Sequence, residues 1–257
     1  MTGFVSIVGA GPGAPDLLTV RAARRLEEAD LVLHDGLVPL ALVEIARHAR
    51  RLPVSRRPGS TRVQPAAAAG LMIDAARANQ RVVRLRAGDP FILARGAEEA
   101  LELVRAGVPF EIVPGLTTAS VAPTLAGIPL THRGVASGFL VVSGHAPEAY
   151  APVLTTLPPH AVTLVVLMGL AERGRIAQVL MERGWRRDTP SVLLLAASHP
   201  DAHVRACRLD RLAEESPQMA PGTPGVLVIG DVVDVGLTIA AAMTPGGRAV
   251  EEIEWQP

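Results

Sequence analysis

Residues 9–16 read Gly-Ala-Gly-Pro-Gly-Ala-Pro-Asp, and they join an apolar run at 4–8 to an amphipathic pattern at 15–29. A short β-rich run followed by glycines and a helical pattern is typical of the strand–turn–helix units of α/β proteins. Glycines in such a turn allow a ligand to approach the backbone closely. The stretch therefore predicts a ligand-binding turn after the first strand.

The same turn matches the fingerprint of dinucleotide-binding proteins. Gly9, Gly11 and Ala14 occupy the positions of G-x-G-x-x-G/A, and Asp35 ends the next predicted strand, where a ribose-binding acid is expected. Pro12 and Pro15 have no backbone N–H, so the turn offers fewer donors to a pyrophosphate. The turn by itself leaves open an NAD-dependent oxidoreductase or a site for a less anionic ligand.

Strand-like and helix-like segments alternate along the first half of the chain, which predicts βαβ units and a parallel sheet. We expect strands at 4–8, 31–34, 51–54, 81–85 and 110–113, and helices at 15–29, 39–48, 65–78 and 94–106. Pro114 and Gly115 break this alternation. We therefore predict an N-terminal α/β domain over residues 1–115.

The second half has a different organisation, in which some strands follow one another without a helix between them. We expect strands at 139–143, 163–168, 191–196, 204–209 and 225–233, helices at 117–125 and 171–183, and an irregular proline-rich segment at 147–159. Such a series predicts a mixed sheet. The C-terminal α/β domain is expected over residues 116–245, followed by a tail over residues 246–257.

Composition excludes several classes of protein. The net charge is zero and only 3% of the residues are aromatic, which argues against nucleic-acid and membrane-surface partners. All 25 basic residues are arginines, which excludes Schiff-base enzymes and Walker-type phosphate sites because both need lysine. There is one cysteine, and we find no signal-peptide pattern and no apolar run that could span a bilayer. A cytoplasmic protein is therefore expected.

Several further motifs follow the turn in a fixed order. Together these segments resemble the tetrapyrrole methylase family over residues 4–233. The resemblance rests on VGAGPGAPDLLT (8–19), VLHDGLV (32–38), VVRLRAGDPF (82–91), RGAEE (95–99), VPGLTTAS (113–120), GIPLTHR (127–133), SGH (143–145), LMG (167–169) and VLVIGDVV (226–233). Their joint order and spacing are far more specific than the glycine fingerprint alone.

This resemblance implies an α/β protein of two domains, with a parallel sheet in the first, a mixed sheet in the second and the active site in the cleft between them. It implies S-adenosylmethionine as methyl donor and a homodimeric assembly. The most similar members of the family methylate uroporphyrinogen III at C-2 and C-7 to give precorrin-2. A related methylase acting on a later corrin precursor, such as precorrin-4, is the alternative within the family.

The resemblance also implies roles for individual residues. Asp35 matches the family's proton acceptor, and Arg56 stands where the family usually has a proton-donating lysine. Arginine stays charged at any accessible pH, so Arg56 can act only electrostatically. The positions that contact S-adenosylmethionine in the family correspond here to Pro12, Ala87, Gly88, Asp89, Ile92, Thr117, Thr118, Met168 and Ala197.

The substrate's eight carboxylates suit arginine forks, which bind carboxylates through paired hydrogen bonds. Candidate arginines for this role are Arg56, Arg57, Arg62, Arg84, Arg86 and Arg133. A metal site is not predicted. His199 and His203 have the spacing of a zinc pair only on a helix, and Pro200 makes a helix there unfavourable.

Overall fold

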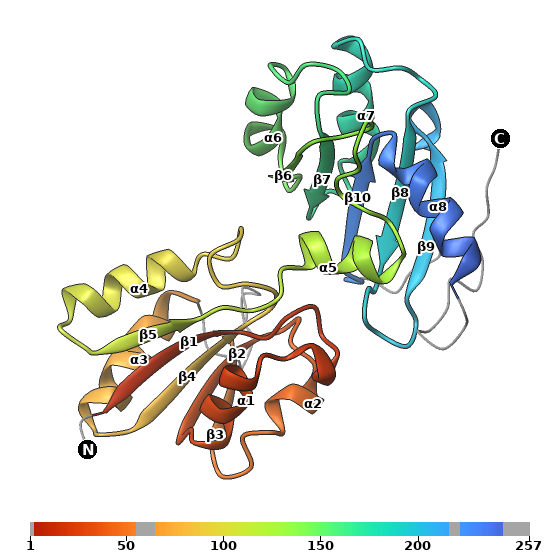
Figure 1. Ribbon diagram of the computed structural model, residues 1–257. Coiled ribbons are helices and arrows are strands. Elements are labelled where there is room, and N and C mark those ends of the chain that lie inside the picture. Colours follow the sequence, from red (N-terminus) through yellow and green to blue (C-terminus); the bar gives the residue numbers. More distant parts are fainter. Residues whose placement is uncertain (1–2, 55–64, 216–221, 244–257) are drawn as a thin grey trace. The chain divides into compact units, whose positions relative to one another are not determined.

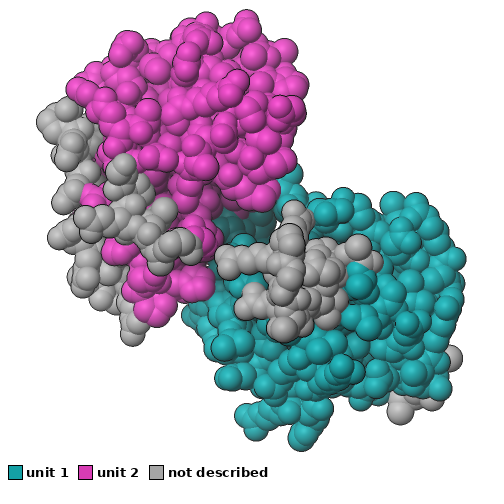
Figure 2. All heavy atoms as spheres, turned by 180° about the vertical axis from the view of Figure 1, so that it is seen from behind, with its two compact units in different colours: residues 1–118 teal, residues 119–257 magenta. Residues whose placement is uncertain are grey.

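The computed structural model describes residues 3–54, 65–215 and 222–243, and the chain divides into two compact units, Met1–Thr118 and Ala119–Pro257 (Figure 2). The division falls after Thr118, whereas the sequence placed it after Gly115. The two boundaries differ by residues 116–118, which the structure groups with unit 1. The tail expected at 246–257 lies outside the described residues.

Unit 1 contains a five-stranded, wholly parallel sheet with the strand order β3-β2-β4-β1-β5, which confirms the parallel sheet predicted from the alternation. The strands are β1 (Phe4–Gly9), β2 (Leu31–Asp35), β3 (Arg50–Val54), β4 (Arg81–Arg86) and β5 (Phe110–Val113). The helical elements are η1 (Pro15–Leu17), α1 (Val20–Glu27), α2 (Leu40–Val43), α3 (Pro65–Arg77) and α4 (Gly96–Arg105).

Alternation along the strands produces two buried faces in unit 1. On β4, Val82 faces the core under α3 and α4, whereas Val83 and Leu85 face the core under α1 and α2. Figure 1 shows these two pairs of helices on opposite sides of the sheet. The result is a three-layer unit whose strands all end at one edge.

Two predicted helices of unit 1 are shorter than expected. The segment 15–29 begins as the 3-10 turn η1, and α1 starts only at Val20 because Thr19 is extended and its side chain accepts a hydrogen bond from the Ala22 N–H. The segment 39–48 keeps α-helical geometry only over α2. The helix that follows the glycine turn is therefore offset from it by several residues.

Unit 2 contains a five-stranded mixed sheet with the order β6-β7-β10-β8-β9, in which β6 and β7 are parallel and the other pairs are antiparallel. This confirms the expected mixed sheet. The strands are β6 (Phe139–Ser143), β7 (Thr163–Leu167), β8 (Pro190–Leu195), β9 (His203–Arg208) and β10 (Gly225–Ile229). The helical elements are α5 (Thr118–Leu125), α6 (Pro147–Leu154), α7 (Arg173–Glu182), η2 (Leu209–Arg211) and α8 (Val232–Ala242).

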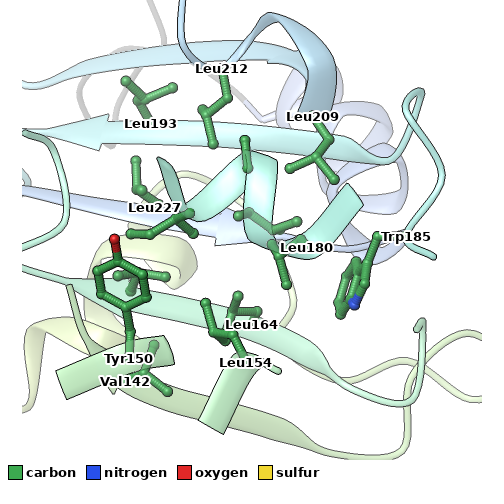
Figure 3. Packing of buried hydrophobic residues seen from close by; sticks show 14 of the residues in the cluster. Val142, Tyr150, Leu154, Leu164, Leu180, Trp185, Leu193, Leu209, Leu212 and Leu227 are labelled. Atoms are coloured by element: carbon green, nitrogen blue, oxygen red, sulfur yellow. The ribbon is translucent and has the colours of Figure 1, made fainter. Parts of the chain in front are cut away.

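Two expectations for unit 2 were wrong. The segment 147–159 was expected to be irregular, but α6 forms there because Pro147 suits a first turn and Tyr150 and Leu154 are fully buried in the core (Figure 3). The strand expected at 225–233 ends at Ile229, since Gly230 adopts a φ of 144° and α8 follows. In α6 the burial of apolar side chains outweighs the local pattern, whereas β10 ends at a glycine turn.

None of the helices in the described ranges is long and apolar enough to cross a membrane.

Candidate functional site

The carboxyl ends of the five strands of unit 1 lie along one edge of its sheet, which is where open α/β sheets bind ligands. β1 lies between β4 and β5, so the loops that follow these three strands are neighbours. The glycine turn, the segment 87–95 and the segment 114–117 form these loops. Most of the predicted contacts for the methyl donor are in them.

The three loops pack backbone against backbone. The N–H of Gly11 donates to the carbonyl of Gly88 at 3.2 Å, and the N–H of Gly88 donates back to Gly11 at 2.8 Å. A Cβ on Gly115 would lie 2.3 Å from the Gly88 oxygen and 2.7 Å from the Cα of Gly9. Only glycine fits at Gly9 and Gly115, because a Cβ at either residue would overlap backbone atoms.

Asp89 organises this edge. One carboxylate oxygen accepts a hydrogen bond from the Phe91 N–H at 2.9 Å, and the other accepts one from the Gly115 N–H at 3.1 Å. A single side chain thus ties the loop after β4 to the loop after β5. Both oxygens are engaged within the protein, so Asp89 shapes the backbone of the predicted donor site.

The turn offers a poor site for a pyrophosphate. The Ala10 N–H donates to the backbone carbonyl of Arg86 at 2.7 Å, and the Gly11 N–H donates to the carbonyl of Gly88. Pro12 has no N–H. The α-helix that would supply a positive dipole end begins only at Val20. The dinucleotide interpretation therefore loses its physical basis, and the turn suits a ligand without phosphate.

Asp35 ends β2 at the same edge and is paired with a buried arginine. Its Oδ1 lies 2.6 Å from Nη2 of Arg84, whose side chain is only 2% exposed. Burial of the Arg84 guanidinium lowers its pKa, but the carboxylates of Asp35 and Glu99 raise it more, so the pKa lies above its ordinary value. Arg84 is therefore a permanent cation beneath Asp35.

The cluster extends to a second arginine and a second carboxylate. Glu99 on α4 accepts hydrogen bonds on Oε1 from Arg84 Nε at 2.9 Å and from Arg86 Nη1 at 2.8 Å. Nη2 of Arg86 lies 3.8 Å from Oδ2 of Asp35. Two arginines and two carboxylates thus balance each other, and we call these four residues the Asp35 cluster.

The Asp35 cluster corrects one prediction. Arg84 was a candidate for binding substrate carboxylates, but all three of its guanidinium nitrogens already bond to Asp35, Glu99 and the carbonyls of β2 and β4. Sequence reasoning also missed Glu99. The sequence held a signal for it, because residues two apart on a strand face the same side. Arg84 therefore shares the face of Val82, which α4, the helix of Glu99, covers.

The remaining donor contacts predicted in unit 1 lie along the same loops. The Thr118 hydroxyl lies 3.7 Å from the position of a Cβ on Gly88, at the start of α5. Thr117 precedes it and is partly buried, while Ile92 is 43% exposed on the loop after β4. The structure therefore brings together six residues of the predicted set with the loop of Pro12: Ala87, Gly88, Asp89, Ile92, Thr117 and Thr118.

Two predicted donor contacts belong to unit 2. Because β8 and β7 are both antiparallel to β10, they run in the same direction, and Met168 and Ala197 follow their carboxyl ends at one edge. Met168 adopts a φ of 60° and is 52% exposed, so it is not a core residue. A strained backbone under an exposed apolar side chain is typical of a ligand site.

The neighbouring strand β6 ends in a further polar pair at the same edge of unit 2. Oγ of Ser143 lies 2.7 Å from Nδ1 of His145, and the Gly144 N–H donates to Leu167 on β7 at 2.7 Å. Arg133 is exposed on the loop after α5. The Ser143–His145 pair therefore lies at the edge that carries Met168.

Some predicted residues lie outside the described ranges, namely Arg56, Arg57 and Arg62. His203 begins strand β9, so it does not share a helix with His199. Within residues 3–54, 65–215 and 222–243, no group of three or more metal-ligating side chains could hold a metal ion.

Comparison with known proteins identifies the family. Residues 5–213 match the family described as Tetrapyrrole (Corrin/Porphyrin) Methylases. The chain belongs to this family. The resemblance drawn from the motifs is thereby confirmed.

Curated relatives of this tetrapyrrole methylase include two kinds of protein. It is 36% identical over 238 residues to a uroporphyrinogen-III C-methyltransferase of Methanocaldococcus jannaschii, covering 91% of this chain and 98% of the relative. It is 40% identical over 233 residues to siroheme synthase of Zymomonas mobilis, covering 90% of this chain but only 49% of the relative. The chain thus spans about half the length of that siroheme synthase.

Solved structures agree with this assignment. A Thermus thermophilus uroporphyrin-III C-methyltransferase complexed with S-adenyl homocysteine is 37% identical, with a TM-score of 0.79 over 94% of this tetrapyrrole methylase and 100% of that chain. A cobalt precorrin-4 methyltransferase is 27% identical, with a TM-score of 0.78 over 90% of this chain and 96% of that one. Both comparisons confirm the two-domain fold of the family.

Proposed function

We propose that this protein transfers methyl groups from S-adenosylmethionine to C-2 and C-7 of uroporphyrinogen III and so produces precorrin-2. The observation that carries the proposal is the nearly full-length similarity to a uroporphyrin-III C-methyltransferase solved with S-adenyl homocysteine. The identity to the precorrin-4 enzyme is lower, at 27% against 37%. That difference favours uroporphyrinogen III over a later corrin precursor.

The loops of unit 1 suit this donor. S-adenosylmethionine carries a sulfonium centre and no phosphate, so it needs close backbone approach and apolar contact rather than a cluster of N–H donors. Gly88 supplies the close approach and Ile92 an exposed apolar side chain, while Met168 offers a second one in unit 2. We assign the donor site to the nine residues named from the family resemblance.

An electron-rich pyrrole carbon of the substrate attacks the methyl group in line, and the C–S bond breaks as the C–C bond forms. The tetrapyrrole ring is left as a cation that must lose a proton. Asp35 is partly exposed at the carboxyl end of β2 and is held by Arg84. We assign Asp35 as the group that stabilises this cation and accepts the proton.

Arg56 cannot donate a proton, so its part in this proposal is to attract substrate carboxylates. The proposal includes a homodimeric assembly, which follows from the family resemblance and is tested by light scattering on the purified protein. The cytoplasmic location stays a prediction of the sequence.

The activity is tested by anaerobic incubation with S-adenosylmethionine and enzymatically generated uroporphyrinogen III. A product heavier by two methyl groups is expected. Asp35→Asn should lower kcat by about 10²–10⁴-fold while the affinity for S-adenosylhomocysteine stays unchanged. Asp201→Asn, at an exposed turn of unit 2, is the matched control and should behave like the parent.

Bound donor without any methylated tetrapyrrole would reject uroporphyrinogen III as substrate. Methylation of precorrin-4 alone would support the alternative within the family. An Asp35→Asn variant with the parent's kcat would remove Asp35 from the mechanism.

A further inference from the structure

The Asp35 cluster is unusual because three of its four charged side chains are mostly buried although they lie at the edge of a sheet. Arg84 and Arg86 have side chains that are 2% and 9% exposed, and Glu99 is 13% exposed. Burying ions is costly unless each is paired and hydrogen-bonded. Two arginines on one strand therefore need a reason beyond packing.

The four side chains share their bonds unequally. Glu99 Oε1 accepts from both arginines, while Glu99 Oε2 and Arg86 Nε are buried without a hydrogen-bond partner in the described part of the chain. Asp35 Oδ1 accepts from Arg84 at 2.6 Å, but Oδ2 stands 3.8 Å from Arg86. One oxygen of Asp35 is thus fixed, and the other has no comparably short bond to the cluster.

We propose that Arg84 and Glu99 are positioning residues that act on the reaction through Asp35. Arg84 holds Oδ1 and so orients Oδ2 for the proton of the substrate ring. Glu99 accepts a hydrogen bond from Nε of the same guanidinium and cancels part of its charge, so Asp35 is paired with a partly neutralised cation. This inference rests on the proposed function of Asp35.

The charges around Asp35 determine the sign of each effect. The described groups that face it are Arg84 and Arg86 from β4, Glu99 from α4 and, on its own strand, His34, whose Nδ1 lies 3.2 Å from the Asp35 carbonyl oxygen. Removing a positive charge favours protonation of Asp35, and removing the negative charge of Glu99 disfavours it. The two kinds of variant must therefore shift its titration in opposite directions.

The test compares pH profiles of kcat for Arg84→Gln, Glu99→Gln and the parent. A proton acceptor must be deprotonated, so the acid limb should move up by about 1–3 pH units in Arg84→Gln and down in Glu99→Gln. Arg84→Lys keeps the charge but loses the fork, so it should lower kcat with a smaller shift of the acid limb.

Glu102→Gln is the matched control, since Glu102 is another glutamate on α4, beyond the RGAEE motif, whose side chain is 50% exposed and paired with Arg105. It should leave the profile unchanged. Donor affinity, measured by calorimetry with S-adenosylhomocysteine, should be the same in all variants. If Arg84→Gln does not fold, Glu99→Gln and Arg84→Lys decide the question.

The same shifts can be measured without turnover, by ¹³C NMR titration of the side-chain carboxyl groups, with Asp35→Asn identifying the Asp35 signal. Opposite shifts support the proposal. Lower activity with unshifted profiles and unshifted signals would make Arg84 and Glu99 merely structural. An inactive parent whose Asp35 signal still shifts would reject the proposed function and leave the electrostatic coupling within the cluster established.

Discussion

Gly115→Ala tests the backbone packing of the loops in the proposed donor site. The new Cβ would lie 2.3 Å from the carbonyl oxygen of Gly88, where real Cβ atoms keep at least 3.0 Å. The loops after β4 and β5 must then separate by about 0.7 Å, the difference between these distances. All the neighbouring atoms are backbone, so no side-chain rotation can relieve the overlap.

Overpacking of this kind costs about 1–3 kcal/mol, and we expect a value near the upper end because the Asp89 bond to the Gly115 N–H is disturbed as well. Unit 1 should lose about 2–3 kcal/mol of unfolding free energy, or roughly 8–12 °C in its thermal midpoint. The affinity for S-adenosylhomocysteine should fall by about tenfold or more, since a loss of 1.4 kcal/mol in binding is already tenfold.

Hydrogen exchange of the β1 and β4 amides measures the stability of unit 1. Both tryptophans, Trp185 and Trp255, belong to unit 2, so tryptophan fluorescence should be unchanged and provides an internal reference. Gly70→Ala in α3 is the matched control, because its Cβ would meet nothing within 4 Å, and it should stabilise by about 0.5–1 kcal/mol. Equal stability and equal donor affinity in the two variants would refute the packing argument.

Two further predictions concern single residues of unit 2. Burial and the hydrogen bond to Glu172 raise the pKa of Tyr150, the only tyrosine, to about 12, so phenolate absorbance should appear only well above the ordinary range. The unfolded tyrosine ionises near pH ~10, so the stability that neutral Tyr150 contributes to the fold is complete below that pH and is lost as the pH rises towards 12. A phenol that titrates like a free tyrosine would contradict this prediction. Burial raises the pKa of Cys207, the only cysteine, to about 12, so a thiol reagent should label the chain only after unfolding, and rapid labelling of the native protein would show that the thiol is accessible.

The parallel sheet of unit 1 was predictable because its signals are local. Each strand is a short apolar run bounded by turn residues, and the glycine turn at 9–14 follows from residue types alone. The elements that were misjudged have conflicting local signals. Pro152, a residue that disfavours helices, lies within α6. Only Gly230 and Asp231 separate the apolar residues of β10 from those of α8, so the two elements read as one apolar run.

The candidate site was predictable in its location but not in its chemistry. The rule that ligands bind beyond the carboxyl ends of strands placed Asp35 and Asp89 near the site. It could not show that both oxygens of Asp89 bind backbone N–H groups, because the Gly115 N–H comes from a distant part of the chain. Arg84 was a candidate for binding substrate carboxylates for the same reason, because its partners Asp35 and Glu99 come from other elements of the fold.

The sequence by itself determined the family, the order of the strands along the chain and the residue types of the loops after β1, β4 and β5, since motif spacing and periodicity are properties of the chain. Only the tertiary structure decided how the charges are paired. Nothing in the sequence distinguishes Arg84 from the other arginines. The packing of β2, β4 and α4 brings Asp35 and Glu99 within hydrogen-bonding distance of it. Charge pairing depends on distances between residues that are far apart in the sequence. Burial decides whether solvent screens the paired charges.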